Sequence, residues 1–304
     1  MSSILPVVSR IALRRCAVLA LAAALIVSGC AHGSSADATH GRLVVAAAVY
    51  PVAYAAERVG GNLVVVRNLT APGAEPHDLE LTPRQIEAIR RADLVVYLSH
   101  RFQPAVEEAV ASARRRFDAL SAVGPLASSP EDARATDPHF WQDPSRMIRA
   151  ADGIASALAA ADGGHAASFR NRAGGLDAEL NDLDRAYKAG LASCTRHEIV
   201  TSHAAFGYLA ARYGLRQIPI AGLDPETEPT PRRLAEVSTL VHRYHATTVF
   251  FETLLSPKLA QTIAREAHVG TDALDPIEGV RGSDTYFTVM HRNLAALRRA
   301  LDCT

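Results

Sequence analysis

The stretch HDLELTPRQIEAIRRADLVVYLS, residues 77–99, contains a helix start, a helix and a strand in immediate succession. Thr82 is typical of a helix N-cap and Pro83 suits the first helical position. Ile86 and Ile89 fall on one face of the predicted helix. The run DLVVYLS that follows is predicted to be a strand. This order of elements decides the fold class.

Two apolar runs precede this stretch, LVVAAAV at 43–49 and NLVVVRNL at 62–69. The first is continuously apolar, which fits a strand buried on both faces, and the second is similar. Strand, helix and strand in this order predict parallel βαβ units.

The second half of the chain repeats the pattern. TPRRLAEVSTLVHRY begins at Thr230 with the same Thr-Pro-Arg start, and the predicted strand TTVFFET follows at 247–253. HEIVTSH, at 197–203, is a predicted strand that runs into a helical segment ending at Gly214. We therefore predict an α/β protein with two lobes, each built on a mostly parallel sheet, at 42–161 and 193–304. A chain of 304 residues has room for two such domains.

A long amphipathic helix is predicted between the lobes, at 162–192. Four large residues recur there at spacings of three and four: Leu176, Leu180, Leu183 and Tyr187. The pair Gly174-Gly175 weakens the middle of this helix. About 26 helical residues would span roughly 39 Å, enough to run along both lobes. A helical connector predicts lobes that hinge little.

The N-terminus has the pattern of a secretory signal at residues 1–29. Three arginines precede the apolar run CAVLALAAALIV, which is too short for a comfortable membrane span. Val27 to Cys30 resembles a bacterial lipobox, in which cleavage leaves Cys30 as the lipid-bearing first residue. The alternative is a cleaved signal with an accidental cysteine. Residues 30–41 are small and polar, as expected of a flexible tether. We expect an extracytoplasmic protein held to the cell membrane by lipid at Cys30.

The four cysteines are expected to have different fates. Cys16 leaves with the signal and Cys30 takes the lipid, which leaves Cys194 and Cys303 in an oxidising compartment. We expect a disulfide between them. Two buried free thiols are the alternative.

Composition excludes some classes of function. Hydrophobic residues make up 48% and charged residues 21% of the chain, which are values of a globular protein. Lysine plus arginine equals aspartate plus glutamate, at 32 each, so the chain as a whole has no basic field for nucleic acid. We expect no nucleic-acid partner.

Candidate metal ligands stand at the predicted strand exits, where ligands of open α/β sheets gather. They are His77, His139, His203 and Asp275. Three imidazoles and one carboxylate suit a borderline ion such as Zn²⁺. Any single histidine is more often a surface residue than a ligand. However, His77 and His139 each follow a proline, which restricts the backbone and lowers the entropy lost on forming a site.

Several stretches together resemble a known family: AEPHDLELTPRQIEAIRRADLVVY, DPHFWQDP, TSHAAFGYLAARYGL, DPETEPTPRRLAEV, FFETLLSPKLAQTIARE and LDPIEG. They are similar to the ABC-transporter solute-binding lipoproteins that capture zinc or manganese, and the similarity extends from about Leu43 to Cys303. The resemblance implies two lobes joined by a rigid helix, with the metal between them. It also implies ligands at His77, His139, His203 and Asp275.

The third ligand bears on the identity of the metal. Manganese-binding members tend to have glutamate there, and His203 favours the softer zinc ion. Many zinc members insert a histidine-rich loop before the second ligand, and GPLASSPEDARATDPHF has no histidine before His139. We expect Zn²⁺, with Mn²⁺ or Fe²⁺ as alternatives.

The predicted function is therefore capture of zinc and its delivery to an ABC-transporter permease by a monomeric binding protein. A zinc hydrolase is a rival hypothesis, but it needs an open coordination position, and the chain has no His-Glu-x-x-His motif. We therefore predict that the protein is not an enzyme. A surface adhesin is the other alternative.

Three neighbours of the predicted site have supporting interpretations. Glu228 and Glu252 lie near strand exits and could orient a ligand imidazole through its second nitrogen, although Glu252 is equally an interdomain or capping group. Trp141 is expected to pack beside the site. Asp143 is expected to cap the helix that begins near Pro144.

Overall fold

A computed structural model describes residues 41–127 and 136–304 of the chain. The predicted signal peptide, the lipobox, Cys16, Cys30 and the tether up to residue 40 lie outside the described residues. Within the described part, no helix is both long and apolar enough to cross a membrane.

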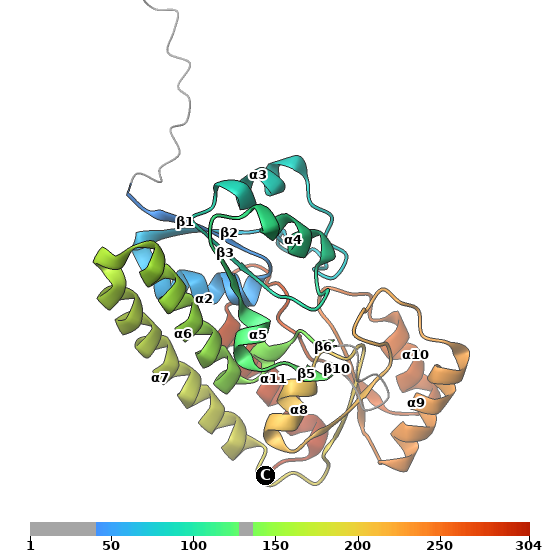
Figure 1. The fold of residues 1–304 in the computed structure, drawn as a ribbon. Coiled ribbons are helices and arrows are strands. Elements are labelled where there is room, and N and C mark those ends of the chain that lie inside the picture. The colour runs from blue at the N-terminus through green and yellow to red at the C-terminus, as the bar shows by residue number, and fades with distance from the viewer. Residues whose placement is uncertain (1–40, 128–135) are drawn as a thin grey trace, which may run out of the picture. The chain divides into compact units, whose positions relative to one another are not determined.

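The first lobe contains a four-stranded parallel sheet in the order β2-β1-β3-β4 (Figure 1). Its strands are β1 Leu43–Ala47, β2 Val64–Asn68, β3 Leu94–Tyr97 and β4 Arg116–Asp118. Its helices are α2 Tyr50–Gly60, α3 Pro83–Arg91, α4 Pro104–Ala109 and α5 Ala119–Val123. The predicted parallel βαβ arrangement is confirmed.

The second lobe has the same architecture, with a parallel sheet in the order β10-β9-β7-β8. Its strands are β7 Glu198–Thr201, β8 Arg216–Pro219, β9 Thr248–Phe251 and β10 Gly270–Ala273. Its helices are α8 Gly207–Tyr213, α9 Pro231–Arg243 and α10 Lys258–Glu266. A short antiparallel pair, β5 Leu126–Ala127 and β6 Thr136–Asp137, precedes the His139 segment.

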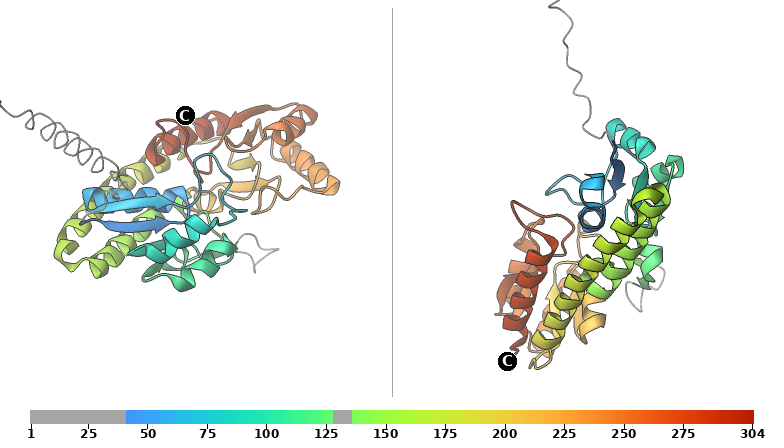
Figure 2. Two further views of the ribbon diagram at one scale, coloured as in Figure 1. Left: turned by 90° about the horizontal axis from the view of Figure 1, so that it is seen from above. Right: turned by 90° about the vertical axis from the view of Figure 1, so that its left-hand side faces the viewer.

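Three longer helices complete the fold: α6 Pro144–Ala161, α7 Ala166–Gly190 and α11 Tyr286–Leu301. Figures 1 and 2 show α6 and α7 side by side, and α7 also contacts α2 and α11. The connecting helix is thus present, but it begins later than residue 162. The Asp162 side chain accepts a hydrogen bond from the Gly164 amide and caps a short 3-10 turn before α7 starts.

The helix starts follow the predicted capping chemistry. The Thr82 side chain accepts a hydrogen bond from the Gln85 amide at the start of α3, and Thr230 accepts one from the Arg233 amide at the start of α9. Asp143 accepts one from the Ser145 amide at the start of α6. These caps fix where each helix leaves its preceding loop.

The largest hydrophobic core extends through both lobes. It includes Val45 and Val96 of the first sheet, Leu180 of α7, and Ile199 and Leu209 of the second lobe. Residues 41–304 accordingly form one compact unit. A shared core supports the expectation that the lobes hinge little, because separating them would expose apolar surface to water.

Cys194 and Cys303 form a disulfide, as expected, and their Cα atoms lie 3.9 Å apart. The bond ties the segment that follows α7 to the residue just beyond α11. It closes a loop of 109 residues along the sequence.

We predict that the double variant Cys194→Ala/Cys303→Ala loses about 2–5 kcal/mol of unfolding free energy, because a long loop is no longer closed in the unfolded chain. Urea titration of the oxidised protein and the variant measures this loss. Equal midpoints, or two alkylatable thiols in the unreduced protein, would contradict the prediction.

Candidate metal centre

Four loops bring one side chain each to a common point. His77 lies in the loop between β2 and α3, and His139 lies between β6 and a short 3-10 turn, Phe140–Gln142. His203 follows β7, and Glu278 lies in the loop after β10. One potential ligand atom from each residue lies within 4.8 Å of every other. Both lobes therefore contribute to one cluster, which we call the His3Glu cluster.

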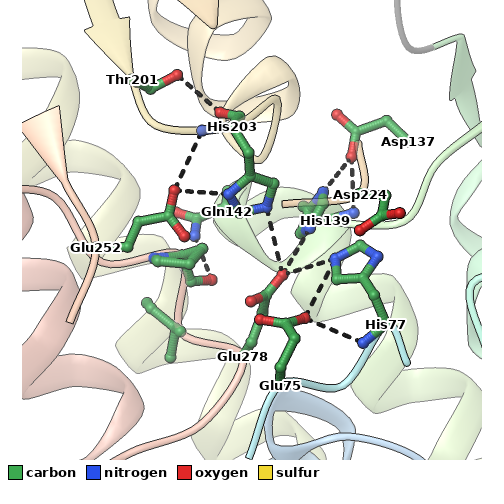
Figure 3. A network of polar contacts seen from close by, with 12 residues as sticks. Glu75, His77, Asp137, His139, Gln142, Thr201, His203, Asp224, Glu252 and Glu278 are labelled. Atoms are coloured by element: carbon green, nitrogen blue, oxygen red, sulfur yellow. Dashed lines mark hydrogen bonds and ion pairs between the residues drawn. The ribbon is translucent and has the colours of Figure 1, made fainter. Parts of the chain in front are cut away.

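The three imidazoles point their Nε2 atoms at one carboxylate oxygen (Figure 3). Glu278 Oε1 lies 2.8 Å from His139 Nε2, 3.1 Å from His77 Nε2 and 3.6 Å from His203 Nε2. The last distance is too long for a hydrogen bond. His203 Nε2 and Glu278 Oε2 are accordingly buried without a hydrogen-bond partner.

Unpaired polar atoms at such depth are rare and indicate a missing partner such as a bound ion. His139 and His203 are fully buried, and Glu278 is 1% exposed. Three nitrogens and one oxygen converging at this range match the ligand set that zinc prefers. The residues present therefore fit a zinc ion.

Two of the imidazoles are oriented from behind by carboxylates. His139 Nδ1 lies 2.8 Å from Asp137 Oδ1, and His203 Nδ1 lies 2.6 Å from Glu252 Oε1. An ionised carboxylate only accepts hydrogen bonds, so each Nδ1 is the donor, and Nε2 is the atom that faces the cluster. The predicted contact of Glu252 with the second ring nitrogen of a candidate ligand is thus present. Glu228 is exposed.

Asp137 also shapes the His139 segment itself. The same Oδ1 atom accepts a hydrogen bond from the His139 backbone amide at 2.9 Å. Gly207 at the start of α8 packs against Asp137, and a Cβ atom at that position would lie only 2.6 Å from Asp137 Oδ2. Glycine is therefore needed there for the second lobe to approach this carboxylate closely.

Charges in the cluster perturb one another strongly. Burial opposes protonation of His139, but its hydrogen bonds to Asp137 and Glu278 outweigh this effect and raise its pKa. For His203, burial is likewise outweighed, here chiefly by the charge of Glu252, and the pKa lies well above its usual value. Burial would raise the pKa of Glu278, yet the three imidazoles hold it well below the usual range.

Glu75 stands at the rim of the cluster. Its Oε1 accepts a hydrogen bond from the His77 amide at 3.1 Å, while its Oε2 is buried without a partner. Burial and the nearby charge of Glu278 raise the pKa of Glu75 to about 8. A proton held there at neutral pH would limit the negative charge around the ligands.

The structure does not bring the fourth predicted residue, Asp275, into the cluster. Asp275 Oδ2 accepts a hydrogen bond from Thr253 Oγ1, and Oδ1 accepts one from the Ile277 amide at 2.7 Å. Both oxygens thus hold the turn that carries Glu278, and Glu278 takes the position predicted for Asp275. The two carboxylates lie in the same LDPIEG stretch, and only the longer side chain, three residues on, reaches the histidines.

Trp141 packs beside the cluster as expected, with its ring centroid 5.4 Å from that of His139. Its indole Nε1 donates to the carbonyl oxygen of Pro276 at 2.7 Å, and Gln142 Nε2 donates to the same oxygen at 2.6 Å. The buried hydroxyl of Tyr286 donates to the Trp141 carbonyl at 2.7 Å. The His139 segment is therefore bonded directly to the segment that carries Glu278.

Comparison with known proteins supports this description. The family described as zinc-uptake complex component A, periplasmic (ZnuA), matches residues 45–300. The chain belongs to this family. It is 32% identical to the zinc-binding lipoprotein AdcA of Streptococcus pneumoniae over 94% of the chain, but spans only 60% of the length of that relative. It is 30% identical to the high-affinity zinc uptake system protein ZnuA of Bacillus subtilis, over 91% of the chain and 94% of the relative.

Solved structures show the same fold. The Zn(II)-bound ZnuA-like domain of S. pneumoniae AdcA has a TM-score of 0.75 at 32% identity, over 86% of this chain and all of that domain. The laminin-binding protein Lmb of Streptococcus agalactiae, described as bifunctional with adhesin and metal transporting activity, has a TM-score of 0.79 at 31% identity over 85% of the chain and 99% of Lmb. The predicted membership of the zinc-binding solute-binding family is thus confirmed.

The raised pKa values predict how stability depends on pH without metal. His139 and His203 stabilise the folded state fully below their unfolded pKa of about 6.5, and this contribution is lost as the pH rises through the folded values. The lowered pKa of Glu278 stabilises the fold above about 4.3, and that contribution is lost in acid.

We therefore expect the unfolding free energy of the metal-free protein to fall as the pH rises from about 6 to 9, and to fall less in Glu278→Gln. Urea titrations over this range measure both slopes. A flat profile for the unsubstituted protein would contradict the assigned directions of the shifts.

Proposed function

We propose that the protein is an extracytoplasmic lipoprotein that captures Zn²⁺ between its lobes and delivers it to an ABC-transporter permease. His77, His139, His203 and Glu278 are the proposed ligands, and Cys30 is the proposed site of the lipid. The observation that carries the proposal is the convergence of three Nε2 atoms and one carboxylate in a buried cluster. Membership of the zinc-uptake family supports it.

Binding of zinc would exchange protons for the ion. A metal-ligating imidazole must be neutral, and His139 and His203 hold protons more tightly than an isolated histidine does. Zinc would displace these protons and would then be stabilised by the negative charge of Glu278. Capture is therefore favoured at neutral pH and opposed in acid.

The cluster suits holding an ion more than catalysis. Four protein ligands complete the tetrahedral coordination of zinc and leave no open position for a reacting water. Among the four side chains, His77 is 9% exposed, whereas the other three are 1% exposed or less. The ion would enter and leave past His77.

His139→Ala should lower zinc affinity by at least about a hundredfold, because it removes a ligand as well as the partner of two carboxylates. Competition titration with a chromophoric chelator measures the loss. The exposed His165→Ala is the matched control and should bind as the unsubstituted protein does. Equal affinity of the two variants would contradict the ligand assignment.

A second pair of variants decides between the two carboxylates of LDPIEG. Glu278→Gln should weaken zinc binding by more than about tenfold, and Asp275→Asn should weaken it less, because Asp275 supports only the turn. Thermal unfolding of the metal-free variants shows whether both remain folded. A larger loss of zinc affinity in Asp275→Asn than in Glu278→Gln would indicate that Asp275 is the ligand.

Cell adhesion is a second candidate function, supported by the similarity to Lmb. Binding of the zinc-loaded and metal-free protein to immobilised laminin tests it directly. Saturable binding in both states would support adhesion, and no binding in either would exclude laminin as a partner.

A further inference from the structure

Six exposed arginines gather where the strands of the first sheet begin. Strands of a parallel sheet start at one common edge, and here β1 starts at Leu43, β3 at Leu94 and β4 at Arg116. The arginines at or just before these starts, which we call the basic edge, are Arg42, Arg90, Arg91, Arg114, Arg115 and Arg116.

Backbone contacts place these segments side by side. The Asp93 amide donates to the Val44 carbonyl at 2.8 Å, and the Val95 amide donates to the Arg115 carbonyl at 2.9 Å. The three strand starts are therefore adjacent, and their arginines share one surface.

Few acids offset this charge. Glu87 forms ion pairs with Arg90 and Arg91, and Asp93 Oδ1 lies 3.9 Å from Arg114 Nη1. Leaving Arg42 aside, two carboxylates against five guanidinium groups leave the basic edge positive, although the whole chain is neutral.

The charges are directed to solvent. The side chains of Arg91 and Arg114 are 80% and 68% exposed. In the part of the chain that the structure describes, neither Arg115 nor Arg116 has an ion pair with a carboxylate. Repulsion among these like charges lowers the stability of the folded protein, and few ion pairs offset it.

The basic edge lies at the opposite end of the sheet from the metal centre. His77 follows the C-terminal end of β2, and a strand of five residues spans about 17 Å. These arginines therefore do not contact the His3Glu cluster.

The chain reaches this edge from the proposed lipid anchor. Gly41 is the first described residue and lies two residues before β1. Only residues 31–40 separate it from Cys30, and ten residues span at most about 36 Å. A lipid at Cys30 would therefore hold the basic edge close to the membrane surface.

We propose that the basic edge binds the headgroups of anionic phospholipids, an inference that rests on the proposed anchor at Cys30. Arginines near an anionic bilayer gain electrostatic energy that falls off within about 10 Å at ordinary ionic strength. Contact at this edge turns the C-terminal ends of the strands, and with them the His77 side of the cluster, away from the bilayer. The anchored protein then presents its metal site to the medium in a capture orientation.

The test uses unlipidated protein, so that it does not depend on the anchor. Residues 41–304 form a compact unit of their own, and a chain beginning at residue 30 with Cys30→Ser retains that unit. Its binding to vesicles of phosphatidylcholine, with and without about one-third phosphatidylglycerol, is measured by co-sedimentation at low and high salt. We expect binding only to the anionic vesicles, and loss of that binding at high salt.

The triple variant Arg114→Gln/Arg115→Gln/Arg116→Gln should lose at least about tenfold in vesicle affinity, with unchanged zinc affinity. A matched control removes three exposed arginines from α9 and α10 of the second lobe: Arg232→Gln/Arg243→Gln/Arg265→Gln. The control should bind vesicles within about twofold of the unsubstituted chain.

Absence of binding to anionic vesicles, or equal losses in the two triple variants, would overturn the proposal. Neither result bears on the proposed lipid attachment at Cys30, which is tested separately. Cells are labelled with a fatty-acid probe, and the label on the native chain is compared with that on Cys30→Ser. A native chain that carries no more label than Cys30→Ser would overturn the proposed anchor.

Discussion

The carbonyl oxygen of Pro276 joins the two lobes beside the metal centre. It accepts hydrogen bonds from the side chains of Trp141 and Gln142, which follow His139 in the first lobe. Pro276 itself lies two residues before Glu278 in the second lobe. One atom thus sets the distance between two proposed ligands that are 139 residues apart in the sequence. The shared hydrophobic core and the Tyr286 hydroxyl reinforce this join.

Burial of several titratable groups in one place is costly, and the fold offsets that cost by pairing them. The imidazoles of His139 and His203 each have one carboxylate beside Nδ1 and Glu278 beside Nε2. Without metal, protons on the imidazoles balance the carboxylates. With zinc, the ion would take over that balance, so the same network that stabilises the metal-free fold also prepares the ligand geometry.

The helix starts, the buried strands and the candidate histidines could be predicted from the sequence, because the patterns that indicate them are local. Thr82 and Pro83 define a helix start by capping chemistry alone, and continuous apolar runs define the buried strands. The three ligand histidines follow strand ends, where residues distant in sequence meet. Their local contexts, together with the family resemblance, selected them from twelve histidines.

The choice between Asp275 and Glu278 could not be made in that way. It depends on a hydroxyl from Thr253, on the Asn293 amide that brackets the Asp275 backbone, and on the left-handed conformation of Ile277, whose φ is 63°. These contacts come from other segments, and none is visible in LDPIEG itself. The exact start of α7 within the predicted stretch 162–192 likewise depends on a side chain, because Asp162 accepts a hydrogen bond from the Gly164 amide before the helix begins.

Anomalous diffraction from zinc-loaded crystals, collected at the zinc absorption edge, tests the central claim most directly. We predict a single strong peak about 2.0–2.1 Å from the Nε2 atoms of His77, His139 and His203, with the Glu278 carboxylate completing the coordination. A peak bound by Asp275 in place of Glu278, or one outside the His3Glu cluster, would contradict this assignment.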